Sequence, residues 1–392
     1  GPGCWRRRRL AGSTRTAGSR MTGRAAGAIH WVHGLGAARL EAGTTVVADD
    51  AGMLDTADLY HLTQLAEVNS WRLVLVGDPH QLQAVGRGGM FHELTVTGRV
   101  HELDRIHRFT EPWQAEASLA LRRGDPDAAR AYVDHGRVQT LHPALVTERI
   151  AQTHQRVTSR GRTVAITTSS AATARAINEE IQWQRHRRRP RGPSIPLADG
   201  TELHLGDQIA TRRNHPGLVT DTGIAVRNRH TWIVTAIHAD GGIAVTDDTH
   251  GTVTLPPDYV AEHVELGWAV TGYGNQGITA DHAICVIEPG TTRAGVYVGL
   301  TRGRDRNTAI ILDPTGTADP EEALARAITR PANATTAHAA RDRLHRAQGL
   351  EPPTTDVTRP ATDIDIAAQR MLTLLDQHAA DVRQRPPLSR GL

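Results

Sequence analysis

The fold of this chain is decided by residues 44–84, which read TTVVADDAGMLDTADLYHLTQLAEVNSWRLVLVGDPHQLQA. Two short apolar runs, Thr44–Ala48 and Leu73–Val76, flank a stretch with leucines at helical spacing over Ala57–Ser70. This order predicts a strand, a helix and a second strand in a parallel sheet. Because ligands bind outside the carboxyl ends of such strands, the polar residues after each run are expected to face one crevice.

Acidic and polar residues follow both predicted strands. Asp49 and Asp50 end the first strand, and the sequence GDPHQ at 77–81 ends the second. Mg²⁺ prefers carboxylate, water and phosphate oxygens, so Asp49 is a candidate metal ligand. The alternative is that Asp49 only caps the following turn. Gln81 could sense a phosphate or a water through its amide, and the alternative is a polar turn residue.

The composition argues against several classes of protein. A chain of 392 residues can form two or three domains, and its formal net charge is +3. It contains no lysine, so arginine supplies every permanently charged basic side chain. Cys4 and Cys285 form no metal-type or redox pair, which fits a reducing cytoplasm and argues against a disulfide framework. No apolar run approaches the roughly 20 residues that a membrane span needs, so no membrane partner is expected.

The pattern along the chain changes twice after residue 140. Thr163–Thr167 predicts a strand and Ala171–Arg185 a helix. Residues 201–263 then carry short β-prone runs between turn residues, which predicts a small antiparallel barrel. The α/β pattern returns with predicted strands at Trp268–Thr271, His282–Ile287 and Thr308–Leu312. The barrel is therefore expected to be an insertion in the second α/β domain.

Five motifs occur in a recognisable order. They are TTVVADDAGM (44–53), VLVGDPHQLQAVGRGG (74–89), ELDRIHRF (102–109), GWAVTGYGNQGITAD (267–281) and VYVGLTRGRDRN (296–307). In content and order they resemble the motifs of RecD-like superfamily-1 DNA helicases, and within that group the helicase half of TraA/TrwC-type conjugative relaxases. GDQIATRRN (206–214) and TVTLPPDYV (252–260) resemble the inserted SH3-like barrel of that group.

This resemblance implies an α/β fold of two RecA-like parallel-sheet domains of the P-loop NTPase type. The first would be N-terminally truncated, and the second would carry the SH3-like barrel. The expected domains are a truncated first motor domain at 1–140, a second motor domain at 141–200 and 264–316, the barrel at 201–263 and a helical C-terminal tail at 317–392. A helix is expected over Asp363–Arg383 in that tail.

The resemblance also implies ATP and Mg²⁺ as cofactors and single-stranded DNA as the partner. It assigns catalytic roles to Asp49, Asp50, Gln81, Arg108 and Arg302, with Asp49 holding the metal. It assigns nucleotide contacts to Gly77, Asp78, Gln81, Gln276, Gly277 and Arg302, and DNA contacts to Thr271, Tyr273, Thr279 and Arg212. Two positions depart from the family pattern: Asp50 stands where relatives have a glutamate, and Tyr273 stands where many have a histidine.

The chemistry of these residue types agrees with those roles. A guanidinium gives planar, bidentate, permanently charged contact to phosphate and stabilises charge in the transition state of phosphoryl transfer. In isolation Arg108 or Arg302 would more often be a surface arginine, and it is their place in the motifs that favours the γ-phosphate. Asp50 is one methylene shorter than glutamate, so its reach to the attacking water is reduced.

One expected motif is absent from the sequence. A phosphate loop has the pattern G-x-x-x-x-G-K-[ST], and a chain without lysine cannot supply it. Residues 15–38 resemble the segment that follows this loop, so the loop and any nicking domain are expected before residue 1. An upstream relaxase, or a fragment with the Walker A loop, is then an expected partner. We expect weak or no ATP hydrolysis by this chain alone.

Two functions follow from these observations. The first is an ATP-dependent helicase or translocase module acting on single-stranded DNA. The alternative is a catalytically inactive DNA-binding or scaffold remnant of such a helicase. The relaxase reaction itself lacks its parts, because the 21 histidines include no H-x-H or HExxH arrangement. An unrelated P-loop-type NTPase with a signalling role is disfavoured by the paired arginines and the inserted barrel.

Overall fold

The computed structural model covers most of the chain in full. For β1 (Cys4–Arg8) and β2 (Arg20–Thr22) it describes the backbone, and it describes residues 40–84, 86, 88–103, 106–187 and 192–331 completely. By its contacts the chain divides into Gly1–His92 with Ile106–Thr336, and Glu93–Arg105 with Ala337–Leu392. Apart from Glu93–Thr97, the features below belong to the first of these units. The helix predicted over Asp363–Arg383 lies outside the described residues.

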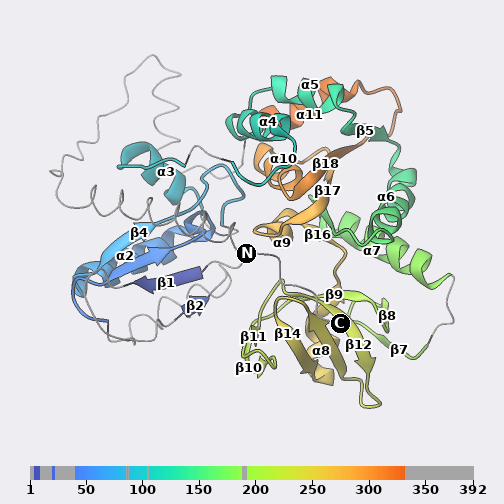
Figure 1. Ribbon diagram of the computed structural model, residues 1–392, viewed down its shortest axis with the longest axis horizontal. Helices are drawn as coiled ribbons and strands as arrows, with labels where there is room; N and C mark the ends of the chain where they lie inside the picture. The colour runs from blue at the N-terminus through green and yellow to red at the C-terminus, as the bar shows by residue number, and fades with distance from the viewer. Residues whose placement is uncertain are drawn as a thin grey trace. The chain divides into compact units, whose positions relative to one another are not determined.

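The first sheet has the strand order β2-β1-β3-β4 (Figure 1). Strands β3 (Thr45–Ala48) and β4 (Arg72–Leu75) run parallel, and helix α2 (Thr56–Val68) connects them. Asp55 caps α2, because its side chain accepts a hydrogen bond from the backbone N–H of Asp58 at 2.8 Å. The predicted strand, helix and strand are confirmed.

The hydrophobic cluster of the first sheet is small. Leu59 and Leu62 of α2 are buried against β3 and against Trp71 and Phe91, and Leu65 is partly buried beside them. A short 3-10 turn, η2 (Ala51–Met53), follows β3, and helix α3 (Met90–Thr97) begins at the end of this segment. The leucine spacing therefore predicted the inner face of α2 correctly.

The second sheet is parallel throughout and has the strand order β16-β6-β17-β18-β5. Its strands are β5 (Val138–Leu141), β6 (Val164–Thr168), β16 (Ala269–Thr271), β17 (Ala280–Ile287) and β18 (Gly303–Leu312). Its helices are α4 (Pro112–Arg123), α5 (Asp127–Asp134), α6 (Pro143–Thr158), α7 (Ala171–His186), α10 (Arg293–Leu300) and α11 (Pro320–Thr329). The predicted α/β fold with a parallel sheet is confirmed.

Helices cover both faces of this sheet, and strand β17 shows how. Ile284 and Val286 belong to the cluster that contains residues of α6 and α7, whereas Cys285 and Ile287 belong to the cluster of α4, α5, α10 and α11. Successive side chains of a strand point to opposite faces, so an uninterrupted apolar run is what a strand buried on both faces requires.

Helices α4 and α5 pack with the second sheet. Leu121 and Tyr132 share a cluster with Leu300 of α10 and Leu324 of α11. Strand β5, which was not predicted from the sequence, forms the edge of the same sheet next to β18. Residues 112–140, which the sequence assigned to the first motor domain, therefore contribute to the second core. Helix α11, which the sequence assigned to the tail, is part of that core as well.

An antiparallel sheet is inserted between α7 and β16. It has the order β14-β13-β12-β9-β15, with β9 (Gln208–Thr211), β12 (Thr231–Ile237), β13 (Ile243–Asp247), β14 (Gly251–Leu255) and β15 (Val264–Leu266). The short β-prone runs predicted in this region form antiparallel strands, and β15 lies at one edge of the sheet. Further short elements are β7 (Ser194–Pro196), β8 (Glu202–His204), β10 (His215–Val219), β11 (Ala225–Val226) and α8 (Pro257–His263).

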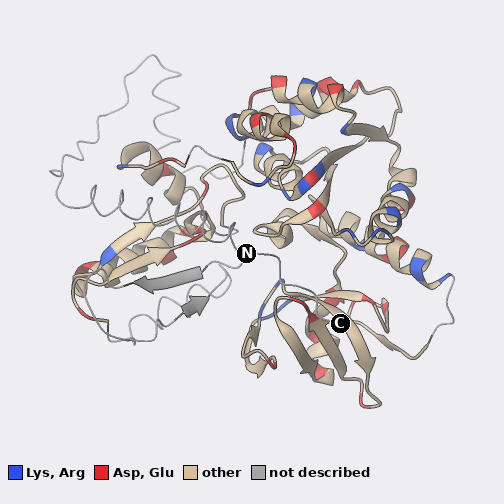
Figure 2. Cartoon of the chain, viewed as in Figure 1, with Lys and Arg blue, Asp and Glu red and all other residues tan. Residues whose placement is uncertain are grey.

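Arginines do not gather on one face of the helices. Figure 2 shows basic and acidic positions mixed on helices α4 to α7. Several are paired within a helix, as are Arg175 and Glu179 on α7 at 2.9 Å. A candidate site for an anionic partner must therefore come from particular arginines and not from the overall charge.

Candidate functional site

The carboxyl ends of β3 and β4 are tied together by backbone hydrogen bonds. The N–H of Val76 donates to the carbonyl of Ala48 at 2.7 Å, and the N–H of Ala51 donates to the carbonyl of Val76 at 2.8 Å. Asp49 and Asp50 lie at this edge. Asp50 has a left-handed backbone, with φ 53°, and its N–H donates to Asp49 Oδ1 at 3.0 Å.

These two carboxylates have different environments. Asp49 is exposed, whereas Asp50 is partly buried. Burial raises the pKa of Asp50, and the neighbouring charge of Asp49 raises it further. The exposed Asp49 carboxylate is the better placed of the two to bind a cation, and Asp50 is the one whose proton affinity is increased.

The GDPHQ segment forms a close turn after β4. A side chain at Gly77 would bring its Cβ within 3.1 Å of the Ala51 nitrogen and of a ring carbon of Phe91, so glycine relieves a tight contact there. Asp78 organises the turn: its Oδ1 accepts from the N–H of His80 at 3.0 Å, and its Oδ2 lies 3.4 Å from Gln81 Nε2. The Gln81 side chain is therefore turned toward Asp78.

Asp78 also contacts the helices of the second sheet. The hydroxyl of Tyr297, on α10, donates to Asp78 Oδ2 at 2.8 Å, and Arg122 Nε, on α4, lies 3.7 Å from Asp78 Oδ1. Burial and the Asp78 carboxylate raise the pKa of Tyr297, so its hydroxyl remains a donor at neutral pH. A polar bridge thus joins the turn after β4 to α10.

This bridge can be tested by Tyr297→Phe, which removes only the hydroxyl. We expect the free energy of unfolding to fall by about 1–2 kcal/mol, because a hydrogen bond to a charged acceptor is lost. The measurement is urea unfolding of Tyr297→Phe, Asp78→Asn and the double variant. If the two single effects add, the hydroxyl and the carboxylate are not coupled and the bridge does not contribute.

Thr301 holds both arginines of the predicted site. An Arg108 nitrogen donates to the Thr301 carbonyl, and Arg302 donates from one terminal nitrogen to Thr301 Oγ1 at 2.9 Å. Arg302 Nε donates to the carbonyl of Val298 at 2.8 Å, and Thr301 Oγ1 itself donates to the carbonyl of Tyr297 at 2.7 Å. The end of α10 therefore fixes both guanidinium groups.

Both arginines are held by neutral oxygens, and Arg302 is buried whereas Arg108 is half-buried. Arg302 is only 2% exposed. In the described part of the chain, neither guanidinium lies within 4.0 Å of a carboxylate oxygen. Burial and the charge of Arg108 together lower the pKa of Arg302 to about 9, and burial lowers the pKa of Arg108. Both remain charged at neutral pH, so an anion would stabilise this end of α10.

Opposite charges lie within electrostatic range of Arg302. Asp50 and Asp78 both act on its pKa, in the direction that favours the charged form. The structure therefore brings together the predicted residues at 50, 78, 81, 108 and 302. Tyr297, Thr301 and Arg122 were missed. Tyr297 lies four residues before Thr301 in the quoted motif, on the same helical face, which is the signal that could have found it.

The glycine-rich turn after β16 forms a short helix, α9 (Gly272–Asn275). A Cβ at Gly272 would lie 2.7 Å from Leu82 Cδ1, so this turn contacts the segment that follows GDPHQ. Gly277 has φ +81°, a conformation that favours glycine. Gln276 Oε1 is buried without a hydrogen-bond partner among the described residues. A buried acceptor without a hydrogen bond destabilises the fold, and a donor from a ligand would remove that free-energy cost.

The predicted DNA contacts are less closely grouped. Thr271 and Tyr273 are half-buried around α9 and Thr279 is exposed, and burial raises the pKa of Tyr273. Arg212 lies in the inserted sheet, where it donates to Glu265 Oε1 at 2.7 Å. Arg212 is thus engaged with a carboxylate in this structure, and its DNA contact stays a prediction.

Comparisons with known proteins agree with the motifs. A family model described as an AAA domain matches residues 9–143. The conjugal transfer protein TraA of Agrobacterium fabrum is 28% identical over 269 residues, which are 67% of this chain and 24% of TraA. The RecBCD subunit RecD of Mycolicibacterium smegmatis is 30% identical over 281 residues, which are 67% of this chain and 49% of RecD. This chain resembles the RecD-like superfamily-1 helicases and TraA. It spans about a quarter of TraA.

A solved structure shows the same fold. Bacteroides Pif1 bound to single-stranded DNA superimposes with a TM-score of 0.50 at 15% identity, covering 81% of this chain and 84% of Pif1. The described residues include no helix long and apolar enough to cross a membrane. They also include no group of three or more His, Cys, Asp or Glu side chains arranged to hold a metal ion.

Proposed function

We propose that this chain is a helicase or translocase module that acts on single-stranded DNA with ATP, and that it corresponds to the helicase part of a conjugative relaxase. One observation carries the proposal: Arg108 and Arg302 both donate to Thr301, a neutral partner, and the buried Arg302 lies within electrostatic range of Asp50 and Asp78. Two cations held by neutral oxygens suit a polyphosphate, whose charge would offset theirs. The order of the motifs and the resemblance to TraA and RecD support the same function.

The residues fit a nucleotide with Mg²⁺ in part. Mg²⁺ is commonly held by one or two carboxylates with waters and phosphate oxygens, so the exposed Asp49 suffices without a cluster of protein ligands. When bound, the metal would neutralise phosphate charge. Arg108 and Arg302 would stabilise the charge that develops on the transferred phosphoryl group. Gln81 would turn from Asp78 to orient the attacking water, and Asp50 would accept its proton.

The domain assignment is also a proposal. We assign the first sheet to one RecA-like motor domain and the second sheet, with α4 to α7, α10 and α11, to the other. We assign the inserted antiparallel sheet to the SH3-like class, and we place the nucleotide between Asp49 and Arg302. Two hydrogen bonds support this assignment. Arg108, from the motif at 102–109, and Arg302, from the motif at 296–307, both donate to Thr301 at the end of α10.

A second function rests on one sequence feature. The 392 residues contain no lysine, so the phosphate-loop cation is absent from them. A DNA-binding or scaffold protein without turnover would use the same fold. A partner that carries the phosphate loop, such as a relaxase polypeptide, would instead restore hydrolysis. Experiment can distinguish a motor completed by a partner from a protein without turnover.

The test measures ATP hydrolysis and strand binding by the chain as it stands. We expect weak or no hydrolysis, and binding to oligothymidylate that weakens with salt, with a log–log slope of about −2 for three neutralised phosphates. Nucleotide affinity that depends on Arg302 supports the motor, and strand binding without nucleotide affinity supports the scaffold. Helicase-like turnover that Asp49→Ala abolishes would contradict the expected inactivity, and absence of strand binding at low salt would refute both functions.

A further inference from the structure

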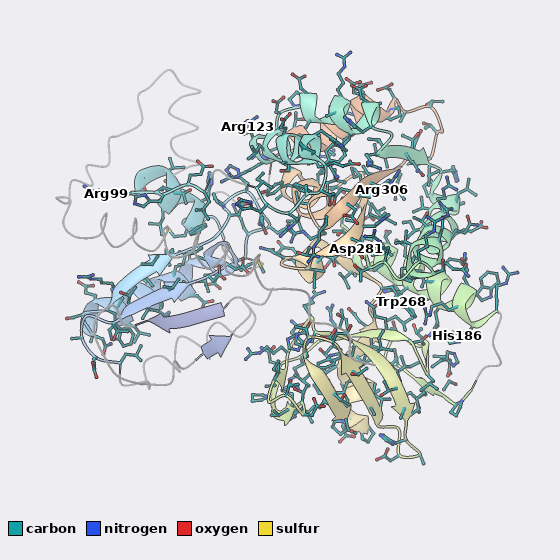
Figure 3. All side chains as sticks on the ribbon, viewed as in Figure 1. Arg99, Arg123, His186, Trp268, Asp281 and Arg306 are labelled. Carbon is teal, nitrogen blue, oxygen red and sulfur yellow. The ribbon has the colours of Figure 1, made fainter. Side chains whose placement is uncertain are left out.

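A small cavity lies where the inserted sheet meets the second parallel sheet. Its volume is about 60 Å³, and its walls come from β9, β12, β6, β16 and α9. The chain passes it at Trp268, between the end of β15 and the start of β16 (Figure 3). At Gly267 a Cβ would lie 2.6 Å from the backbone of Ile209, so the wall is closely packed there. The cavity is therefore held in shape by backbone contacts.

The polar groups around the cavity suit an anion. Arg229, Gln208 and Thr231 line it, and no carboxylate is among the described lining residues. Asn275 also lines it, but its Nδ2 already donates to Ile166 and Thr167. Gln208 Nε2 donates to the carbonyl of Gly267 at 3.0 Å, which leaves its second proton available. A permanent cation among neutral amides and a hydroxyl, in a partly desolvated site, favours a negatively charged group over a cation or a neutral molecule.

Two charged side chains, Arg212 and Glu265, act on Arg229. Burial lowers the pKa of Arg229, Arg212 lowers it further, and Glu265 opposes both. Glu265 already accepts a hydrogen bond from Arg212 at 2.7 Å. Two guanidinium groups thus act on one carboxylate, so these three side chains carry a net charge of about +1 at neutral pH.

The backbone at Arg229 is unusual for an arginine. Its φ is +73°, and among the described residues only Asp50 and Ser70 share a positive φ without being glycine. Ser70 follows the end of α2, and Asp50 lies in the candidate nucleotide site. Glycine or asparagine would adopt this conformation more readily. At Gly274, a Cβ would lie 3.2 Å from an Arg229 nitrogen, so glycine leaves room for the guanidinium.

We propose that this cavity binds a single phosphate group, held by Arg229 with Gln208 and Thr231. A water needs roughly 10–15 Å³ of such volume, so the cavity admits a group of about four oxygens and excludes a nucleobase. The phosphate group belongs either to a nucleic-acid strand or to a free phosphate ion. The first source rests on the proposed function, because a strand must then cross the inserted sheet, whereas the second does not.

The test uses the full chain and two probes. Inorganic phosphate is followed by equilibrium dialysis and by the fluorescence of Trp268, with Trp268→Phe to identify its signal. Oligothymidylate is followed by fluorescence anisotropy. The variants are Arg229→Gln, Arg229→Lys and Arg229→Gly. The control is Arg149→Gln on α6, which makes the same change of charge at an exposed position.

We expect Arg229→Gln and Arg229→Gly to weaken binding of a probe at least about tenfold, Arg229→Lys to weaken it less, and Arg149→Gln to leave it unchanged. Arg229→Gly should also keep or raise the melting temperature, because it relieves the positive φ. An arginine with a purely structural role would instead lower the melting temperature when replaced by glycine, without changing the affinity for either probe.

The two probes distinguish a phosphate group of a nucleic-acid strand from a free phosphate ion. Loss of phosphate affinity alone assigns a free ion, and loss of oligothymidylate affinity assigns a strand. If neither affinity responds to Arg229, the cavity holds water only and the proposal is wrong, even where the wild-type chain binds strands. If the chain binds phosphate through Arg229 but binds no strand, the cavity proposal stands and the proposed function fails.

Discussion

Replacing Arg302 with methionine is expected to remove polyphosphate binding without loss of stability. Methionine has a similar shape and removes a buried charge that no described carboxylate contacts. Exchanging buried charge for apolar packing is often neutral or stabilising by about 1–4 kcal/mol, and the loss of two hydrogen bonds costs about 1 kcal/mol each. We therefore expect the free energy of unfolding to stay within about 1 kcal/mol of wild type or to rise.

The loss of binding should be large by comparison. Tripolyphosphate is the probe, because it carries the charges of the nucleotide without its base. An arginine commonly makes two charge-assisted hydrogen bonds to phosphate, so its removal should weaken affinity by about a hundredfold. The measurement is the shift of melting temperature with tripolyphosphate, which should be present in the wild-type chain and absent in Arg302→Met.

Arg137 provides a matched control within the same chain. It is also buried, at 9% exposed, but it pairs with Glu111 at 2.9 Å and lies over the ring of Trp113. Arg137→Met should lower the free energy of unfolding by about 1–3 kcal/mol and leave the tripolyphosphate shift intact. If Arg302→Met behaves like Arg137→Met, or if the wild-type chain shows no shift, Arg302 is a structural residue and the nucleotide site is wrong.

The contrast between Arg302 and Arg137 shows which features of the site could be predicted from the sequence. Arg302 was singled out from the motif around it, whereas its burial and its neutral partners depend on how α10 packs on the second sheet. The hydrogen bond from Tyr297 to Asp78 joins residues 219 positions apart, and the contact from Arg108 to Thr301 joins residues 193 apart. No local pattern encodes contacts of that separation.

The helices and strands were easier to predict than the sheets against which they pack. The strands β6 and β17 contain apolar runs, Val164–Ile166 and Ala283–Ile287, because these parts are covered on both faces. Strand β5 was missed: two of the four residues in its sequence VQTL are polar, it lies at a sheet edge and it is only partly buried. The packing of α4 and α5 on the second sheet was not predictable, because amphipathic spacing states only that a helix has a buried face and not which sheet covers it.

The second prediction with a large expected effect concerns Trp232 in the inserted sheet. This side chain is 1% exposed and lies on β12 with its ring near His230 and His250, at centroid distances of 5.7 and 5.5 Å. The next residue, Ile233, is 41% exposed, as the alternation of a strand with one buried face requires. Trp232→Ala should lower the free energy of unfolding by about 3–5 kcal/mol.

Trp183 on α7 is the control, because tryptophan is replaced by alanine there too, but at an exposed position. It is 48% exposed, and its ring contacts only the guanidinium of Arg187 among the described ring partners, at 4.5 Å. Trp183→Ala should cost about 1 kcal/mol or less, since an exposed ring loses little burial and one cation–π contact. Urea unfolding of both variants measures the difference.

The Trp232 variant also tests whether the inserted sheet and the second parallel sheet unfold together. Trp232 belongs to one continuous hydrophobic cluster that includes Ile166 of β6 and Ile284 of β17. A cavity in a shared core reduces the protection of every amide that opens with it, so hydrogen exchange should quicken on β17 as well as on β12. Exchange that quickens only on β12 would show that the inserted sheet opens independently. In that case the cavity beside Trp268 would lie at a movable joint, and phosphate bound there would hold the two sheets together by preferring the closed state.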